Sequence, residues 1–167
     1  MDALNELRDR LAIEDCLAAY AQAIDRRDDR LLASLFEPGA RIHYGVFDGT
    51  IEQLLDRRGR PSPMLATHHH IGNIRVKVQG DTARSICYLN AVHRAQGPEG
   101  LRDEMVRARY LDRLMRRAGT WRFVERTLVY DWSRVVPSDG RDWWDGATNA
   151  TAVGRSDGRD PAAGFLD

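Results

Sequence analysis

The feature that most constrains the fold is a run of four long strand-like segments in the second half of the chain. They span roughly residues 66–79, 82–95, 103–117 and 120–133, separated by the turn-forming sequences QGD, QGPEG and RAG. Such short connections join antiparallel neighbours, because parallel strands need a crossover of about a dozen residues or more. The pattern therefore predicts an antiparallel sheet of hairpins and excludes a doubly wound parallel sheet.

The first half of the chain carries helical patterns. Apolar residues recur at steps of three and four over residues 4–26, and a shorter helical pattern covers residues 28–36. Residues 40–47 alternate as a strand with Tyr44 on the inner face, and residues 50–58 predict a third helix. Helices followed by strands indicate an α+β domain, with the helices gathered on one face of an antiparallel sheet.

Length and charge limit the class of protein. A chain of 167 residues can bury a sizeable core within one domain. The 25 Lys and Arg residues balance 25 Asp and Glu residues, which leaves no net positive field for nucleic acid or an anionic membrane. No apolar run approaches the roughly 20 residues of a membrane-spanning helix, and no signal-like apolar core follows the N-terminus. We therefore expect a cytoplasmic protein without nucleic acid or membrane partners.

The C-terminal region differs in composition from the rest. Residues 135–167 are rich in glycine, aspartate and small residues, which is typical of an extended tail. Trp143 and Trp144 lie in this tail and carry too much apolar surface to remain in water. We expect residues 1–134 to form the domain, and the tail to pack on it or on a neighbouring subunit.

The densest group of chemically active side chains is Thr67-His68-His69-His70. Three consecutive histidines suggest a metal site, but neighbouring strand residues point to opposite faces, so only His68 and His70 could share an ion. The alternative is that some of these imidazoles are solvated and another is hydrogen-bonded inside the sheet. We expect no metal.

Other polar side chains could join a histidine in one cavity. Tyr20 and Asp25 lie near the end of the first helix, and Tyr44 lies on the inner face of the first strand. An aspartate at a helix C-terminus opposes the macrodipole, at a cost of up to about 1 kcal/mol when exposed. It therefore suggests a compensating partner such as an imidazolium, although an ordinary surface aspartate beside Arg26 is the alternative.

Three stretches of the sequence resemble a known family: IEDCLAAYAQAIDRRDDRLLASLFEPGARIHY, THHHIGN and GTWRFVERTLVYDW. They resemble the SnoaL-like branch of the nuclear transport factor 2-like superfamily over roughly residues 5–134, a branch that includes scytalone dehydratase, bile-acid dehydratase, lindane dehydrochlorinase and polyketide cyclases. The resemblance implies a cystatin-like α+β roll, in which N-terminal helices cap a cone-shaped, curved antiparallel sheet around a mostly apolar pocket. It also implies a homo-oligomer, a trimer in preference to a dimer, that needs no cofactor.

The resemblance implies roles for individual residues. In dehydratase-like members a strand histidine is the general base and an aspartate ending the first helix holds it. His69 and Asp25 match these positions, since Thr67, His69 and Asn73 satisfy the pattern Thr-x-His-x-x-x-Asn. Tyr20 resembles the catalytic helix tyrosine of bile-acid dehydratase. The side chains expected to bind substrate are Tyr44, His70, Tyr88 and Arg126.

Strand parity leaves a choice between two histidines. Ile74, Val76 and Val78 mark a buried face that would extend back to His70 and not to His69. A β-bulge near Gly72 would reverse this assignment, and glycine is a residue at which bulges form.

The leading hypothesis is a cofactor-independent lyase or isomerase, which performs dehydratase-type elimination or proton transfer on a bulky apolar molecule such as a steroid or polyketide. Neutral His69 could accept a proton at physiological pH, and Asp25 would fix its tautomer. The alternatives are a non-catalytic ligand-binding protein or the structural small subunit of a ring-hydroxylating dioxygenase. A third alternative is a monooxygenase or epoxide hydrolase, which would need a different set of pocket residues such as Asp-Arg-Asp. Asp25 and Arg126 leave this alternative open.

Overall fold

The computed structural model describes residues 2–138, 153–157 and 159–165. Within these ranges the helices precede the long strands, as the sequence predicts. The three helices are α1 (Ala3–Arg26), α2 (Asp29–Ser34) and α3 (Ile51–Arg58). The six strands are β1 (Phe36–His43), β2 (Asp48–Thr50), β3 (Met64–Gln79), β4 (Thr82–Gly97), β5 (Gly100–Arg117) and β6 (Thr120–Pro137).

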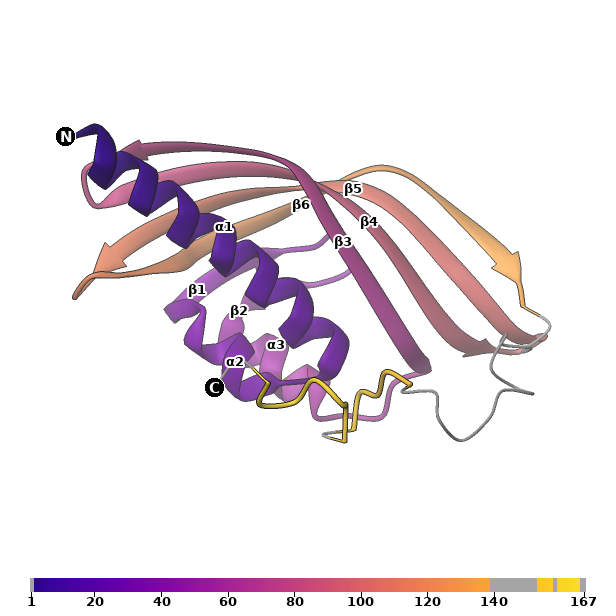
Figure 1. Cartoon of the computed structure of the whole chain (residues 1–167). Coiled ribbons are helices and arrows are strands. Elements are labelled where there is room, and N and C mark those ends of the chain that lie inside the picture. The colour runs from indigo at the N-terminus through magenta and orange to yellow at the C-terminus, as the bar shows by residue number, and fades with distance from the viewer. Residues whose placement is uncertain (1, 139–152, 158, 166–167) are drawn as a thin grey trace.

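All six strands form one curved sheet in the order β2-β1-β6-β5-β4-β3. Figure 1 shows the long strands β3 to β6 curving over α1, while α2 and α3 lie beside the C-terminal half of that helix. This arrangement confirms the predicted α+β fold. One pairing departs from the antiparallel expectation, because β1 runs parallel to β6. Hairpin turns fix the direction of consecutive strands only, and residues 44–119 separate these two strands in the sequence.

The core lies between α1 and the sheet. Ile13, Leu17 and Tyr20 recur on the buried face of α1, and Leu114 and Phe123 meet them from the strands. Each fully buried aliphatic or aromatic side chain of this kind contributes roughly 1.5–3 kcal/mol. The packing therefore fixes the rotation of α1, and with it the direction of the side chains in its last turn.

A β-bulge in β3 decides which histidine faces the helix. The register with β4 shifts between Gly72 and Arg75, and Asn73 has φ of 48°, a left-handed conformation that asparagine tolerates. The more buried positions change parity across this point. The structure thus has the bulge that reverses the parity assignment, and it places His69, not His70, on the face toward α1.

The described part of the C-terminal region lies beside the end of α1 (Figure 1). Asp160 approaches Arg26 with 3.5 Å between the carboxylate oxygen and Nε. Trp143 and Trp144, expected to cover apolar surface, lie outside the described residues. None of the described helices is long and apolar enough to cross a membrane.

Candidate active site

Asp25 and His69 form a tightly bonded pair where α1 meets β3. The Nδ1 atom of His69 lies 2.6 Å from Oδ1 of Asp25, and the backbone N–H of His69 donates to Oδ2 at 2.8 Å. The hydroxyl of Thr67 donates to Oδ1 at 2.8 Å. Both side chains of the pair are only 8% exposed. Three donors therefore hold one carboxylate in place, and that carboxylate orients the imidazole.

The electrostatics of the pair favour an ionised aspartate. Burial by itself would raise the pKa of Asp25, but the hydrogen bonds and charge of His69, followed by the Thr67 hydroxyl, lower it below its usual value. A carboxylate can only accept, so Nδ1 of His69 carries a proton. In the neutral imidazole Nε2 is then unprotonated and available as a base.

His93 is a functional candidate that the sequence analysis missed. Its Nε2 atom lies 3.4 Å from Nε2 of His69, with ring centroids 5.2 Å apart. The pKa of His93 is lowered, chiefly by burial and then by the charge of His69. Alternation along β4 could have revealed this residue, since His93 continues the inward positions Leu89 and Ala91. Two imidazoles therefore face each other beside Asp25.

Tyr20 and Tyr44 belong to a separate cluster. Their hydroxyl groups are hydrogen-bonded to each other. Burial raises the pKa of Tyr44 well above its usual value, and the nearby Tyr20 raises it further, so the phenol stays neutral. Within the described residues neither tyrosine is hydrogen-bonded to Asp25 or His69. The structure thus brings the predicted residues together as two pairs.

Arg126 is placed in the core and not on a cavity wall. It donates to both carboxylate oxygens of Asp112, at 2.6 and 2.9 Å, and both side chains are fully buried. Its guanidinium carbon lies 3.9 Å from the ring centroid of Tyr20, 4.3 Å from that of Tyr110 and 4.2 Å from that of Phe123. Asp112 and three aromatic rings surround Arg126, and its Nη1 has no hydrogen-bond partner among the described residues, so a role of Arg126 in binding substrate stays a prediction.

Tyr88 and His70 differ in how they lie relative to the Asp25 and His69 pair. Tyr88 is 49% exposed, because its neighbours Cys87 and Leu89 occupy the inward positions of β4. His70 pairs with Asn90 in the register and is exposed as well. Strand alternation thus turns Tyr88 to the face opposite His69, and we correct the prediction that Tyr88 lines the pocket. His70 does lie in the wall of a hollow between α1 and β3, together with Asp25 and His69.

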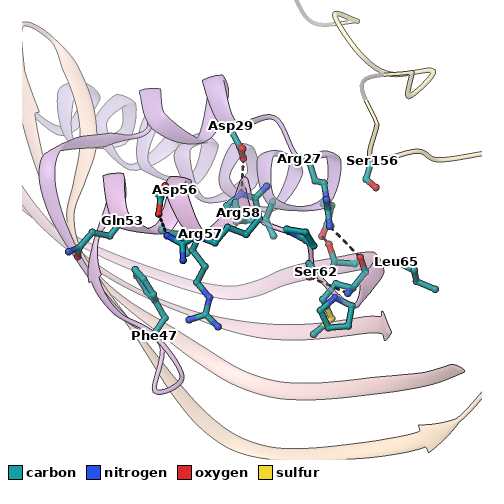
Figure 2. Close-up of a pocket in the computed structure, with 18 of the residues that line it drawn as sticks. Arg27, Asp29, Phe47, Gln53, Asp56, Arg57, Arg58, Ser62, Leu65 and Ser156 are labelled. Carbon is teal, nitrogen blue, oxygen red and sulfur yellow. Dashed lines mark hydrogen bonds and ion pairs between the residues drawn. The ribbon is translucent and has the colours of Figure 1, made fainter. Parts of the chain in front are cut away.

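Two hollows adjoin the Asp25 and His69 pair. The larger, of about 1040 Å³, lies between the end of α1, the helix α3 and the start of β3, and Asp25 and Thr67 are in its wall (Figure 2). The smaller, of about 340 Å³, lies between α1 and β3 and is lined by both Asp25 and His69. The larger hollow matches the size of a small-molecule pocket. No group of three His, Cys, Asp or Glu side chains suited to a metal ion occurs among the described residues.

Comparison with known proteins identifies relatives of this chain. Residues 5–127 match the family of SnoaL-like domains, which confirms the resemblance seen in the sequence. The uncharacterized proteins Rv2910c of Mycobacterium tuberculosis and Mb2934c of Mycobacterium bovis are 34% identical over 134 residues, which cover 75% of this chain and 88% of each of theirs.

Solved structures with the same fold include two dehydrochlorinase-type proteins and one dehydratase. The structure of LinA superposes with a TM-score of 0.73 and 26% identity, covering 86% of this chain and 98% of LinA. LinA type 2, described as a hexachlorocyclohexane dehydrochlorinase, superposes with a TM-score of 0.72 and 24% identity, covering 81% of this chain and 93% of its own. A putative scytalone dehydratase from Novosphingobium aromaticivorans superposes with a TM-score of 0.68 and 25% identity, covering 85% of this chain and 99% of its own.

Proposed function

The chain belongs to the SnoaL-like family, and we propose that it is a cofactor-independent lyase or isomerase in which His69 is the general base. The observation that carries this proposal is the bond between Nδ1 of His69 and the Asp25 carboxylate. That bond leaves Nε2 as the basic atom of a nearly buried imidazole. We propose a bulky, largely apolar substrate such as a steroid or polyketide.

The proposed reaction is abstraction of a proton from carbon. Nε2 of His69 accepts the proton, and the C–H electron pair forms a carbon–carbon double bond. In an elimination the leaving group departs with its own bonding pair; in an isomerisation the proton returns at another carbon. Asp25 stabilises the imidazolium that forms, because its ionised carboxylate is held beside Nδ1.

His93 is suited to assist in this step. Burial lowers its pKa, so it is neutral when His69 acts as base. With its proton on Nε2, His93 can donate to the Nε2 of His69 in the free protein, at the observed 3.4 Å. Once the substrate C–H takes this place at the Nε2 of His69, the same N–H of His93 can donate to a departing oxygen. The two imidazoles thus provide one acceptor and one donor at the same place.

The relatives support the reaction class. The names of LinA type 2 and of the putative scytalone dehydratase both describe elimination, of hydrogen chloride and of water respectively. Elimination begins with loss of a proton from carbon, which is the step that a histidine base with an aspartate partner can perform. The apolar walls of the larger hollow, including Phe47, Leu54 and Met64, suit a bulky apolar body.

Turnover and binding by matched variants test the proposal. Wild type, His69→Ala and the control His70→Ala are incubated with a panel of hydroxy-ketosteroids and polyketide-like alcohols. Elimination is followed by absorbance, and binding by tryptophan fluorescence. Loss of general-base catalysis lowers the rate by roughly 10²–10⁴-fold, so we expect this loss in His69→Ala, with binding retained, and none in His70→Ala. Binding without turnover by wild type would favour a ligand-binding protein or partner subunit.

We also propose that the protein is a homo-oligomer, a trimer in preference to a dimer. Apolar side chains are exposed on the outer face of the sheet, among them Ile86, Tyr88, Leu111 and Trp132. An apolar patch of this kind marks an interaction surface when it is contiguous. Sedimentation as a 19.0 kDa monomer at micromolar concentration would refute the proposal.

A further inference from the structure

The carboxylates in the wall of the larger hollow already form hydrogen bonds or ion pairs within the protein. Five acidic side chains lie in its wall, and each has a partner within the protein. Asp25 bonds to His69 and Thr67, Asp29 to Arg58, Asp48 to Arg41 and His43, Glu52 to the Gly39 N–H, and Asp56 to Arg60. These carboxylates therefore have little need of a cationic ligand.

Two arginines in the same wall have no such partner. Among the described residues, Arg57 donates only to the Val46 carbonyl oxygen, at 3.3 Å, and Arg27 only to the Met64 carbonyl oxygen, also at 3.3 Å. Neither arginine forms an ion pair with any carboxylate in the described part of the chain. A guanidinium has five N–H donors. Most of the hydrogen-bonding capacity and the whole positive charge of each arginine thus remain available to a ligand.

The position of Arg57 directs that charge into the hollow. Figure 2 shows its side chain extending from α3 toward the strands, beside Phe47. The guanidinium carbon lies 5.8 Å from the centroid of the Phe47 ring. Arg27 enters the wall from the end of α1, two residues after Asp25. The hollow thus combines apolar surface with an unpaired positive charge at one side and Asp25 at another.

We propose that the substrate is an amphipathic anion. Its apolar body packs on Phe47 and the neighbouring apolar wall, and its carboxylate, or a comparable anionic oxygen group, binds Arg57, with Arg27 supplying a second positive charge. An anionic oxygen group is the ligand that a guanidinium prefers, because charge-assisted hydrogen bonds to it are the stronger kind. That this anion is a substrate rests on the proposed function, whereas the preference of the hollow for an anion can be measured without any turnover.

A matched pair of fluorescent probes tests this preference. Anilinonaphthalene sulfonate is an apolar anion, and phenylnaphthylamine has the same skeleton without the sulfonate. We expect wild type to bind the anionic probe more tightly, and Arg57→Gln to bind it about tenfold more weakly, as loss of a charge-assisted hydrogen bond implies. Binding of the neutral probe should not change, which also shows that the pocket remains folded.

Arg60→Gln is the matched control. Arg60 lies in the same wall, but it is ion-paired to Asp56 and its side chain is 71% exposed. Its replacement should leave both affinities unchanged. The proposal is overturned if wild type binds the two probes equally, if Arg57→Gln keeps the preference, or if Arg60→Gln loses as much as Arg57→Gln. His69→Ala should keep the preference, so failure of the catalytic proposal and failure of this one are distinguishable.

Discussion

Replacing Arg126 with methionine should strongly destabilise the protein. The substitution leaves the carboxylate of Asp112 buried, with only the Ser85 hydroxyl as a side-chain donor at 3.0 Å. Removing one member of a buried ion pair costs about 3–5 kcal/mol, because the remaining charge is uncompensated. The free energy of unfolding of an ordinary domain is about 5–15 kcal/mol, so the variant would lose a large part of it.

The assay is urea denaturation followed by far-ultraviolet circular dichroism. With a slope of about 2 kcal/mol per molar urea, a loss of about 4 kcal/mol lowers the midpoint by about 2 M. The double variant Arg126→Met with Asp112→Leu should recover most of this loss, since an apolar replacement of both partners is often neutral. Arg113→Met is the control, because its ion pair with Glu125 is 57% exposed on the arginine side and should contribute less than about 1 kcal/mol. A change of less than about 1 kcal/mol in Arg126→Met would refute the structural role of Arg126.

Three further outcomes follow from particular residues. Burial, and then the charge of His69, lower the pKa of His93, so the unfolded chain binds a proton at this residue more readily than the folded chain does. The free energy of unfolding should therefore decrease as the pH falls below the usual histidine pKa of about 6.5. Denaturation at several pH values should show a smaller decrease for His93→Gln. Burial raises the pKa of the Cys87 thiol to about 11. A thiol reagent near neutral pH should therefore label Cys87 much more slowly in the native protein than in urea. Asn73→Val should cost about 1–2 kcal/mol at its positive φ, whereas Asn73→Gly should be tolerated, as thermal unfolding would report.

The sequence was a good guide to the parts of the fold that depend on local patterns. The helical periodicity of residues 4–26 and the turns between the long strands predicted α1 and the hairpins of β3 to β6. Gly72 marked a place where a bulge could turn His69 toward the helix, and the register of β3 with β4 shifts just after it. Local signals suffice there, because periodicity and turn residues act through the backbone itself.

The first short strand was predicted less well. Alternation suggested residues 40–47, whereas β1 covers Phe36–His43 and the expected second helix ends at Ser34. Tyr44 therefore follows the strand instead of lying within it. The reason is tertiary: β1 gains its hydrogen bonds from β6, far away in the sequence, and that pairing decides which residues extend.

The contents of the candidate site show the same limit. Asp25 and His69 were paired through family resemblance, and their bonded geometry is seen in the structure. The burial of Arg126 could not be predicted, because it depends on the register that sets Asp112 opposite it on β5. His93 required the register between β3 and β4, which places it opposite Thr67. Alternation along β4 indicates that His93 faces inward, but a single sequence does not show which residue of β3 it meets.

The central claim is that Asp25 holds His69 with its proton on Nδ1, so that Nε2 is the base. Nitrogen NMR of histidine-labelled protein measures this directly, since protonated and unprotonated ring nitrogens have distinct chemical shifts. For neutral His69 we predict a protonated Nδ1 and an unprotonated Nε2, with the preference weakened in Asp25→Asn, because the charged acceptor at 2.6 Å is lost. A proton on Nε2 in wild type, or a tautomer unaffected by Asp25→Asn, would contradict the account.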